Sequence, residues 1–273
     1  MSTSPTDDLE RQLGAAGDRD DARQMTAYMK GRFEFFGVKT PQRRTLSKNI
    51  ERASKSLTIG DLIGLVDDLR SRRHRELHYV ASDVLRANRT RLPASMIGDV
   101  ERWIVRDPWW DTVDAIASPT VGEMVLRHPE LLAVMDDWIE AGRDTQAGDG
   151  EMWLARAAII HQLRFGDSTD TNRLFGYCLR RADDSDFFIR KAIGWALRQY
   201  ARTDPEAVRT FVDQHRDELS PLSVREATKH LWLVGSAPLS SGRRVRCGTR
   251  RWSSPSLRGA RSAVPSRVRS SRS

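Results

Sequence analysis

The chain has 273 residues, which is enough for one large domain or two small ones with a sizeable buried core. No stretch approaches the ~20 apolar residues of a membrane span, and residues 1–20 lack the apolar segment of a signal peptide. The two cysteines, Cys178 and Cys247, suggest no disulfide framework, so we expect a cytoplasmic protein.

The formal net charge of +8 comes from the C-terminal end of the chain. Residues 236–273 contain ten arginines and no acidic residue, and the rest of the chain has 35 basic residues against 37 acidic ones. The part before residue 236 is therefore close to neutral. Any nucleic-acid surface on it must be a local basic patch rather than a property of the whole domain.

Nearly every segment before residue 235 has the apolar spacing of an amphipathic helix, with glycines and prolines at the joints. We find no alternating pattern that indicates a strand. The first predicted helix is capped by Thr6 and presents Leu9 and Leu13 as its apolar stripe. A second helix is predicted over residues 21–30.

A third helix is predicted to start at Thr40, with Pro41 in its first turn. It presents Arg43, Arg44 and Lys48, which together form a basic face. Because basic residues on one side of a helix are suited to phosphate groups, this face is a candidate nucleic-acid contact.

The following segments are predicted to form pairs of helices. The predicted pairs are 58–69 with 75–87, 93–105 with 108–128, 151–165 with 171–181, and 186–200 with 205–219. A break is expected at Ser118-Pro119, since proline removes a helix hydrogen bond. Residues 129–141 add a helix between pairs, and 220–233 form the last one.

These pairs recur at about the spacing of HEAT-type repeats, although the repeats share little sequence. We therefore predict an all-α protein, a right-handed superhelical solenoid of antiparallel HEAT-like helix pairs. Such a solenoid has a long concave face, which suits an elongated partner.

The sequence divides into two parts, a helical domain over residues 1–235 and a tail over residues 236–273. The tail is rich in Arg and Ser, and its composition predicts disorder. Two interpretations are open: a basic arm that binds a nucleic-acid backbone, or a terminal extension without a role.

The segment over residues 107–116 is the most informative one in the chain. We expect Asp107 to cap a helix and Pro108 to occupy its first turn. Trp110 and Asp114 are four residues apart, so they lie on one face of that helix. This pair is either a half-buried Trp beside a salt-bridged Asp, or an aromatic wall with a carboxylate that binds a cation.

Two later helices carry polar groups among apolar ones. Trp153 precedes Arg156 in an otherwise apolar run, and Lys191, Trp195 and Arg198 form a single helical stripe. Cations neutralise phosphates and Trp contacts sugars or bases, so the stripe is a candidate nucleic-acid surface. The alternative is ordinary packing of Trp195 beside two solvated cations.

We expect no metal ion and no cofactor. His74 and His78 are four residues apart, but no third ligand stands at a suitable spacing, and the neighbouring arginines would repel a cation. The sequence has no glycine loop for phosphates and no dinucleotide fingerprint.

Six segments together resemble the AlkD-like DNA alkylation repair family of HEAT-repeat DNA glycosylases. The resemblance spans about residues 20–231. The matching segments are residues 28–33 (YMKGRF), 37–44 (GVKTPQRR), 109–114 (WWDTVD), 153–158 (WLARAA), 187–198 (FFIRKAIGWALR) and 225–230 (REATKH).

The resemblance implies a role for each matching residue. Asp114 corresponds to the catalytic aspartate, and Trp110 and Trp195 to the two active-site tryptophans. Arg156 and Arg198 correspond to arginines that contact DNA. An aromatic residue near the lesion corresponds to Tyr28. We also assign Lys191, Arg43 and Arg44 to DNA binding.

The resemblance therefore implies a base-excision-repair glycosylase that hydrolyses the N-glycosidic bond of cationic N3- or N7-alkylated purines, such as 3-methyladenine and 7-methylguanine. The expected partner is double-stranded DNA, with no membrane and a monomeric, cytoplasmic protein that associates with the nucleoid through DNA. The alternative is a non-catalytic HEAT-repeat module that binds nucleic acid or protein.

Overall fold

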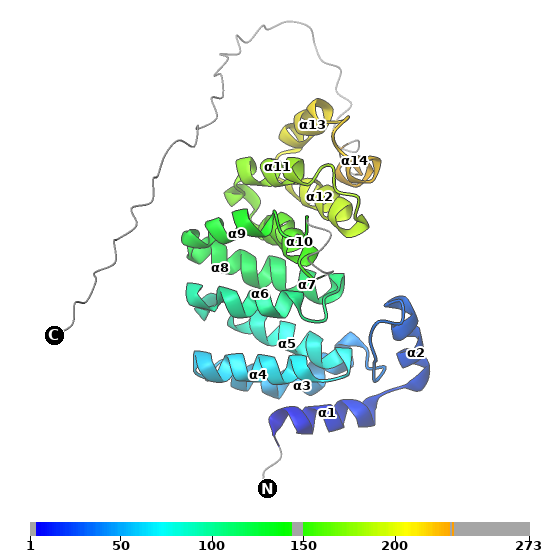
Figure 1. The fold of residues 1–273 in the computed structure, drawn as a ribbon. Helices are drawn as coiled ribbons and strands as arrows, with labels where there is room; N and C mark the ends of the chain where they lie inside the picture. Colours follow the sequence, from blue (N-terminus) through cyan, green and yellow to red (C-terminus); the bar gives the residue numbers. More distant parts are fainter. Residues whose placement is uncertain (1–3, 144–149, 230, 232–273) are drawn as a thin grey trace, which may run out of the picture. The chain divides into compact units, whose positions relative to one another are not determined.

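The computed structural model describes residues 4–143, 150–229 and 231, all within one compact unit, Met1–Gly235 (Figure 1). The predicted tail, residues 144–149 and the end of the last predicted helix lie outside these residues. The described part is all-helical and contains no strand, only an isolated bridge between Glu34 and His74. None of its helices has the length and apolar character needed to cross a bilayer.

The α-helices follow one another along the chain as Figure 1 labels them. Their bounds are α1 Pro5–Ala16, α2 Arg19–Tyr28, α3 Thr40–Ser54, α4 Ile59–Ser71, α5 Arg75–Asn88, α6 Ile97–Val105, α7 Trp110–Ile116, α8 Gly122–Arg127, α9 Leu132–Trp138, α10 Met152–Ile160, α11 Thr171–Arg180, α12 Phe187–Tyr200, α13 Pro205–Gln214 and α14 Pro221–Thr228.

One row of helices runs through the described part of the chain. Helices α3, α5, α7, α10, α12 and α14 each contact the next member of this series. Several other helices pack beside the row, with α4 against α5, α6 against α7, and both α9 and α11 against α10. The arrangement is compatible with a helical solenoid, and we call this series the inner row.

The predicted pairs α4 with α5 and α12 with α13 are in contact, but α12 packs more closely against α14 than against α13. The reason lies at Gly194 of α12. A Cβ atom at this position would lie 2.5 Å from Glu226 Cβ and 2.8 Å from the carbonyl oxygen of Ser223. The missing side chain therefore lets α14 approach the backbone of α12.

Helix starts differ from the predictions by a few residues. Ser4, not Thr6, caps α1, and Thr6 is buried instead. Helix α2 starts earlier than predicted, because the Asp18 carboxylate accepts from two backbone N–H groups of its first turn. The predicted apolar stripe of Leu9 and Leu13 is confirmed, since both side chains are buried.

The expected start of the helix at Asp107 and Pro108 is wrong. Asp107 has a positive φ of 45°, and α7 begins only at Trp110, with extended backbone at Trp109 and no side-chain cap. The expected break at Ser118-Pro119 is instead a π-helical turn, Ala117–Val121, which leads directly into α8. A wider turn tolerates the missing N–H of Pro119 without ending the helix.

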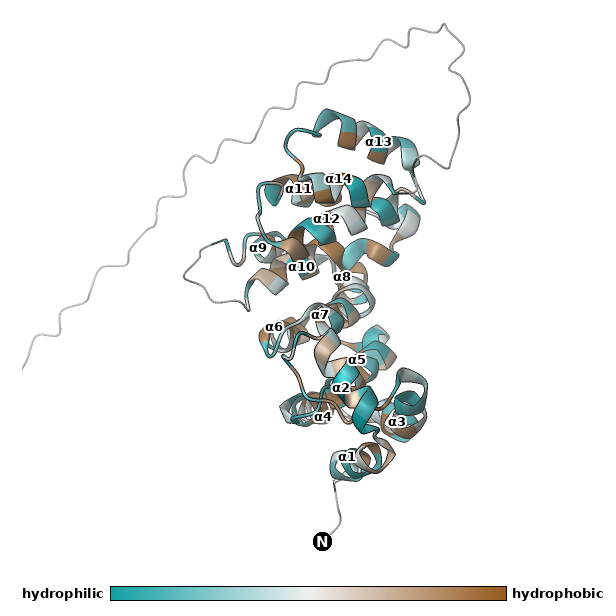
Figure 2. Cartoon of the chain, turned by 90° about the vertical axis from the view of Figure 1, so that its right-hand side faces the viewer, coloured by the Kyte–Doolittle hydropathy of each residue, from teal (hydrophilic) through white to brown (hydrophobic). Residues whose placement is uncertain are grey.

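The core lies between the helices, and most helices carry both hydrophobic and hydrophilic residues (Figure 2). Helix α10 is the exception in burial, because every residue from Trp153 to Ile160 is buried. A helix that is buried all round has neighbours on every side. The one charged residue of this stretch, Arg156, therefore needs a partner within the protein.

Candidate functional site

The inner row brings residues from four distant sequence segments around one pocket. This pocket has a volume of about 380 Å³ and draws its lining from α7, α10, α12 and α14. It is lined by Trp110, Asp114, Arg156, Phe187, Phe188, Lys191, Trp195, Arg198 and Glu226. We call it the Asp114 pocket.

Asp114 is held by a two-point ion pair at the wall of this pocket. Arg156 Nε donates to Asp114 Oδ1 and Arg156 Nη2 donates to Asp114 Oδ2, both at 2.7 Å. The third nitrogen, Nη1, donates to the carbonyl oxygen of Phe188 at 2.6 Å. A fork of this kind restricts the orientation of a carboxylate as well as neutralising it. Asp114 keeps 17 % of its side chain exposed, while Arg156 keeps 6 %.

Burial raises the pKa of Asp114 above its ordinary value of 3.8, and the Arg156 guanidinium opposes this shift. The nearby carboxylate of Asp111 adds to the increase. Desolvation of this kind makes an anion more responsive to positive charge than it is in water. The site therefore presents a fixed, poorly hydrated carboxylate to its pocket.

The structure places Arg156, which is predicted to contact DNA, among groups of the protein. Its guanidinium is nearly buried, and all three of its nitrogens donate to groups of the protein. Arg156 nevertheless lines the Asp114 pocket, so its contact with DNA stays a prediction. The geometry also supports a role in which Arg156 orients Asp114.

The stripe on α12 reaches the same pocket, and it has a partner that the sequence had not indicated. Lys191 Nζ donates to Glu226 Oε1 at 2.9 Å, and Arg198 Nη1 donates to Glu226 Oε2. Trp195, between them along the stripe, is partly buried and lines the pocket. The hydrogen bond from Lys191 is the main cause that lowers the pKa of Glu226 to about 2.

Trp110 lies between the Asp114 pocket and a larger pocket of about 790 Å³, because it lines both. The larger pocket draws its lining from α2, α3, α5 and α7. Tyr28, with 69 % of its surface exposed, meets Trp110 edge to face with 6.1 Å between ring centroids. The predicted aromatic neighbour of the site is thus in contact with the predicted aromatic wall.

The basic face predicted on α3 is only partly formed. Arg44 and Lys48 are exposed, but Arg43 is buried and donates to Asp83 Oδ2 at 2.7 Å. Arg43 also lies over the ring of Tyr79. Its position on the helix turns it towards α5, so the prediction that Arg43 belongs to an exposed basic face is wrong.

A second buried ion pair holds the start of α7. Arg75 donates to both carboxylate oxygens of Asp111, at 3.0 and 2.7 Å, and to the carbonyl oxygen of Asp107 at 2.9 Å. Tyr79 OH donates to Asp111 Oδ2 at 2.7 Å. Sequence reasoning missed this cluster. Asp111 stood in the same motif as Asp114, but nothing local indicated an arginine partner 36 residues away.

His74 and His78, which were considered as metal ligands, instead contact other side chains of the protein. His74 stacks on Phe36, and His78 is buried against Arg75, with its pKa lowered to about 4 by burial and by nearby arginines. Within the described residues, no group of three or more potential His, Cys, Asp or Glu ligands comes together.

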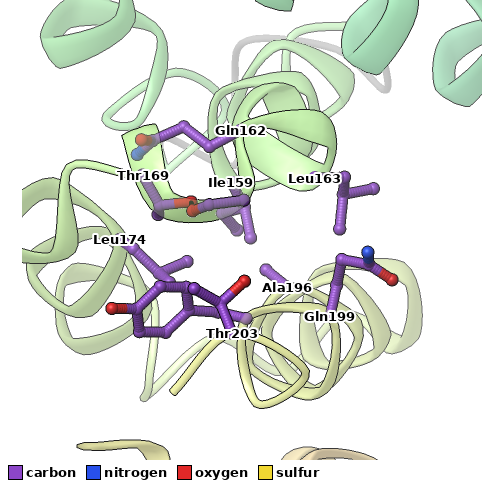
Figure 3. Close-up of a pocket in the computed structure, with 10 residues that line it drawn as sticks. Ile159, Gln162, Leu163, Thr169, Leu174, Ala196, Gln199 and Thr203 are labelled. Atoms are coloured by element: carbon purple, nitrogen blue, oxygen red, sulfur yellow. Dashed lines mark hydrogen bonds between the residues drawn. The ribbon is translucent and has the colours of Figure 1, made fainter.

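A further cavity lies away from Asp114, between α10, α11 and α12 (Figure 3). Gln162, Thr169, Gln199 and Thr203 are among its polar lining residues, and Leu163 and Leu174 are among its apolar ones. Its volume of about 20 Å³ has room for a water molecule but not for a substrate. The Asp114 pocket is therefore the better candidate for chemistry.

Comparisons with known proteins identify the family of the chain. The sequence matches the family described as DNA alkylation repair enzyme over residues 9–231. A solved structure, a predicted DNA alkylation repair enzyme from Enterococcus faecalis, is similar with a TM-score of 0.71 and 30 % identity, covering 79 % of this chain and 96 % of that one. No curated protein matches the chain. On the strength of the family match, the chain belongs to the DNA alkylation repair enzyme family.

Proposed function

We propose that the protein is a DNA glycosylase that hydrolyses the N-glycosidic bond of cationic N3- or N7-alkylated purines in duplex DNA. The observation that carries this proposal is the Asp114 carboxylate, fixed by Arg156 and open to a pocket that Trp110 and Trp195 also line. The family match supports a role in DNA repair, and the proposal adds the reaction and its substrates.

The chemistry requires little more than a well-placed anion. Alkylation at N3 or N7 puts a positive charge on the purine, which then departs as a neutral base without a general acid. Positive charge grows on the deoxyribose as the bond breaks, and carboxylates stabilise such oxocarbenium-like states in glycosidases. Asp114 supplies this charge and can accept a hydrogen bond from the attacking water.

The two tryptophans would face the sugar from either side of the acid. Contacts between a cation and an aromatic face contribute about 0.5–2 kcal/mol each, depending on desolvation. Lys191 and Arg198 would hold the phosphates beside the lesion, and the exposed Tyr28 of α2 and Arg44 of α3 would contact the duplex further from Asp114. The duplex would then follow a concave face of a right-handed solenoid.

Selectivity would follow from the lability of the cationic base. The Asp114 pocket is lined by residues of four helices. It is open, and does not enclose a base closely enough to recognise the hydrogen-bonding groups on its edges. An enzyme of this kind selects its substrates by how easily the base leaves rather than by the shape of the base. Neutral lesions should therefore be poor substrates.

The test is release of free base from a duplex that carries 7-methylguanine or 3-methyladenine. We would compare the wild type, Asp114→Asn and a matched control, Asp213→Asn, which removes an exposed acid of α13. The expected result is release by the wild type and the control, and a loss of about 10²–10³-fold in the Asp114 variant with DNA affinity retained.

The competing function is a non-catalytic module that binds nucleic acid through the same surface. One observation favours it, because a buried two-point pair with Arg156 is a sufficient structural reason for an acid at position 114. Normal DNA binding without base release by the wild type would establish this alternative. Base release that survives in Asp114→Asn would leave a glycosylase whose carboxylate is not Asp114.

A further inference from the structure

Glu226 of α14 occupies a position that the proposed mechanism does not use. Its side chain is 13 % exposed and receives hydrogen bonds from both cations of the α12 stripe. Lys191 Nζ is 2.9 Å from Oε1, and Arg198 Nη1 donates to Oε2 and, at 3.1 Å, to the main-chain oxygen of Glu226. Two cations on either side of Trp195 therefore converge on one carboxylate.

The fold holds this carboxylate in place. Gly194 gives α14 its close approach to α12, since a Cβ atom there would overlap Glu226 Cβ and the Ser223 backbone. The Ser223 hydroxyl donates to the carbonyl oxygen of Arg190 at 2.9 Å, which joins the two helices one turn earlier. Glu226 is thus a built part of the pocket wall.

The charges in the pocket show what this acid does. Its lining carries three cations, Arg156, Lys191 and Arg198, and two acids, Asp114 and Glu226, so the charge that remains is +1. The pKa of about 2 keeps Glu226 ionised at neutral pH. A phosphate that approaches Lys191 and Arg198 meets two cations whose charge and part of whose N–H groups a carboxylate already engages, so it gains less than it would from two free cations.

We propose that Glu226 is a positioning residue that determines specificity: it competes with a DNA phosphate for Lys191 and Arg198 and thereby weakens binding to undamaged DNA. Phosphate contacts are the same for damaged and undamaged duplexes, so they add affinity without selectivity. Reducing them lowers the affinity for both duplexes alike, whereas the negative charge of Glu226 adds an attraction that only the cationic lesion experiences. This inference rests on the proposed function, because it assumes that DNA binds at the Asp114 pocket.

The experiment measures binding to an undamaged duplex, and to the same duplex with one 7-methylguanine, over a series of salt concentrations. Glu226→Gln should bind the undamaged duplex about three- to tenfold more tightly, with a salt dependence steeper by about one counterion. The ratio of affinities for damaged and undamaged DNA should fall. Glu206→Gln removes an exposed acid of α13 outside the pocket and should change neither quantity.

A second variant covers the case in which Glu226→Gln does not fold. Glu226→Asp keeps the charge but reaches the two cations less well, so it should shift both quantities in the same direction by a smaller amount. Circular dichroism would establish that each variant is folded. Binding by either folded variant that is equal to or weaker than that of the wild type would overturn the proposal, and so would an equal change in Glu206→Gln.

The outcomes also separate this inference from the proposed function. A wild type that releases base normally, together with a Glu226→Gln variant whose DNA binding is unchanged, would overturn only the role of Glu226. A wild type that binds no DNA would overturn both.

Discussion

Helix α7 carries two acids, Asp111 and Asp114, and each is bound at two points by a nearly buried arginine. Asp111 meets Arg75 from α5, and Asp114 meets Arg156 from α10. Asp111 has 5 % of its side chain exposed and also accepts a hydrogen bond from Tyr79. Asp114 has 17 % exposed and faces the pocket that contains both tryptophans.

The comparison of these two pairs shows that a two-point bond between a carboxylate and an arginine is not in itself a sign of function. The Arg75 pair also binds the carbonyl oxygen of Asp107, so it fixes the irregular turn from which α7 starts. The Arg156 pair leaves its acid open on one side. We infer that the first pair supports the helix and that the second orients a group for chemistry.

The largest effect is expected from breaking the buried pair. Asp111→Asn leaves the Arg75 charge without its partner and should lower the free energy of unfolding by about 3–5 kcal/mol. Asp114→Asn should cost less, because burial already disfavours the ionised form of Asp114. Urea unfolding of the two variants would measure both values. Equal losses would remove the distinction between a supporting pair and an orienting pair.

The next effect concerns pH and Asp114 alone. Base release needs the ionised carboxylate, and the pKa of Asp114 is raised by burial. The single-turnover rate should therefore begin to fall, as the pH is lowered, at a higher pH than an Asp with the ordinary pKa of 3.8 would allow. Below its pKa the expected decrease is about tenfold per pH unit.

The control for this profile is circular dichroism at each pH, which separates loss of the carboxylate from loss of the fold. A rate that stays level down to pH values near the ordinary pKa of Asp would show that the acid in the rate-limiting step is not desolvated.

The smallest expected effect is a loss of stability in a variant that tests whether Asp111 has only a structural role. Tyr79→Phe removes one hydrogen bond to Asp111 and leaves the Arg75 fork intact, so it should cost about 0.5–1.5 kcal/mol of stability. Base release should stay at the wild-type rate, because the lost hydroxyl bonds the supporting pair and the ring of residue 79 is kept. If release fell strongly while stability changed little, the Asp111 cluster would have to be counted with the chemistry.

Much of the fold could be predicted from helical periodicity, because that pattern depends on neighbouring residues. Leu9 and Leu13 are buried as expected. Helices α4 and α5, which were predicted to form a pair, are in contact. The start of α7 was predicted wrongly. Arg75, 32 residues away from Asp107, binds the carbonyl oxygen of the irregular turn, and no local pattern records such a bond.

The candidate site likewise contains residues whose position was predicted from helical spacing and one residue, Arg43, whose position was not. The four-residue spacing placed Trp110 and Asp114 on one helix face, and the i, i+4, i+7 spacing placed Lys191, Trp195 and Arg198 on another. These five residues line one pocket. The prediction for Arg43 was wrong. Its helix position suggested exposure, but its side chain is turned towards Asp83 of the neighbouring helix α5.

Local patterns in the sequence were enough to predict most helices, many of the chemical groups on their faces and membership of a repair family. The tertiary structure decided the partners of those groups: Arg156 for Asp114, Arg75 for Asp111, and Glu226 for the two cations of α12. The physical reason is range. Helical periodicity is read from residues a few positions apart, whereas each of these ion pairs joins helices that only packing brings together, at positions such as Gly194 where one missing side chain sets the distance.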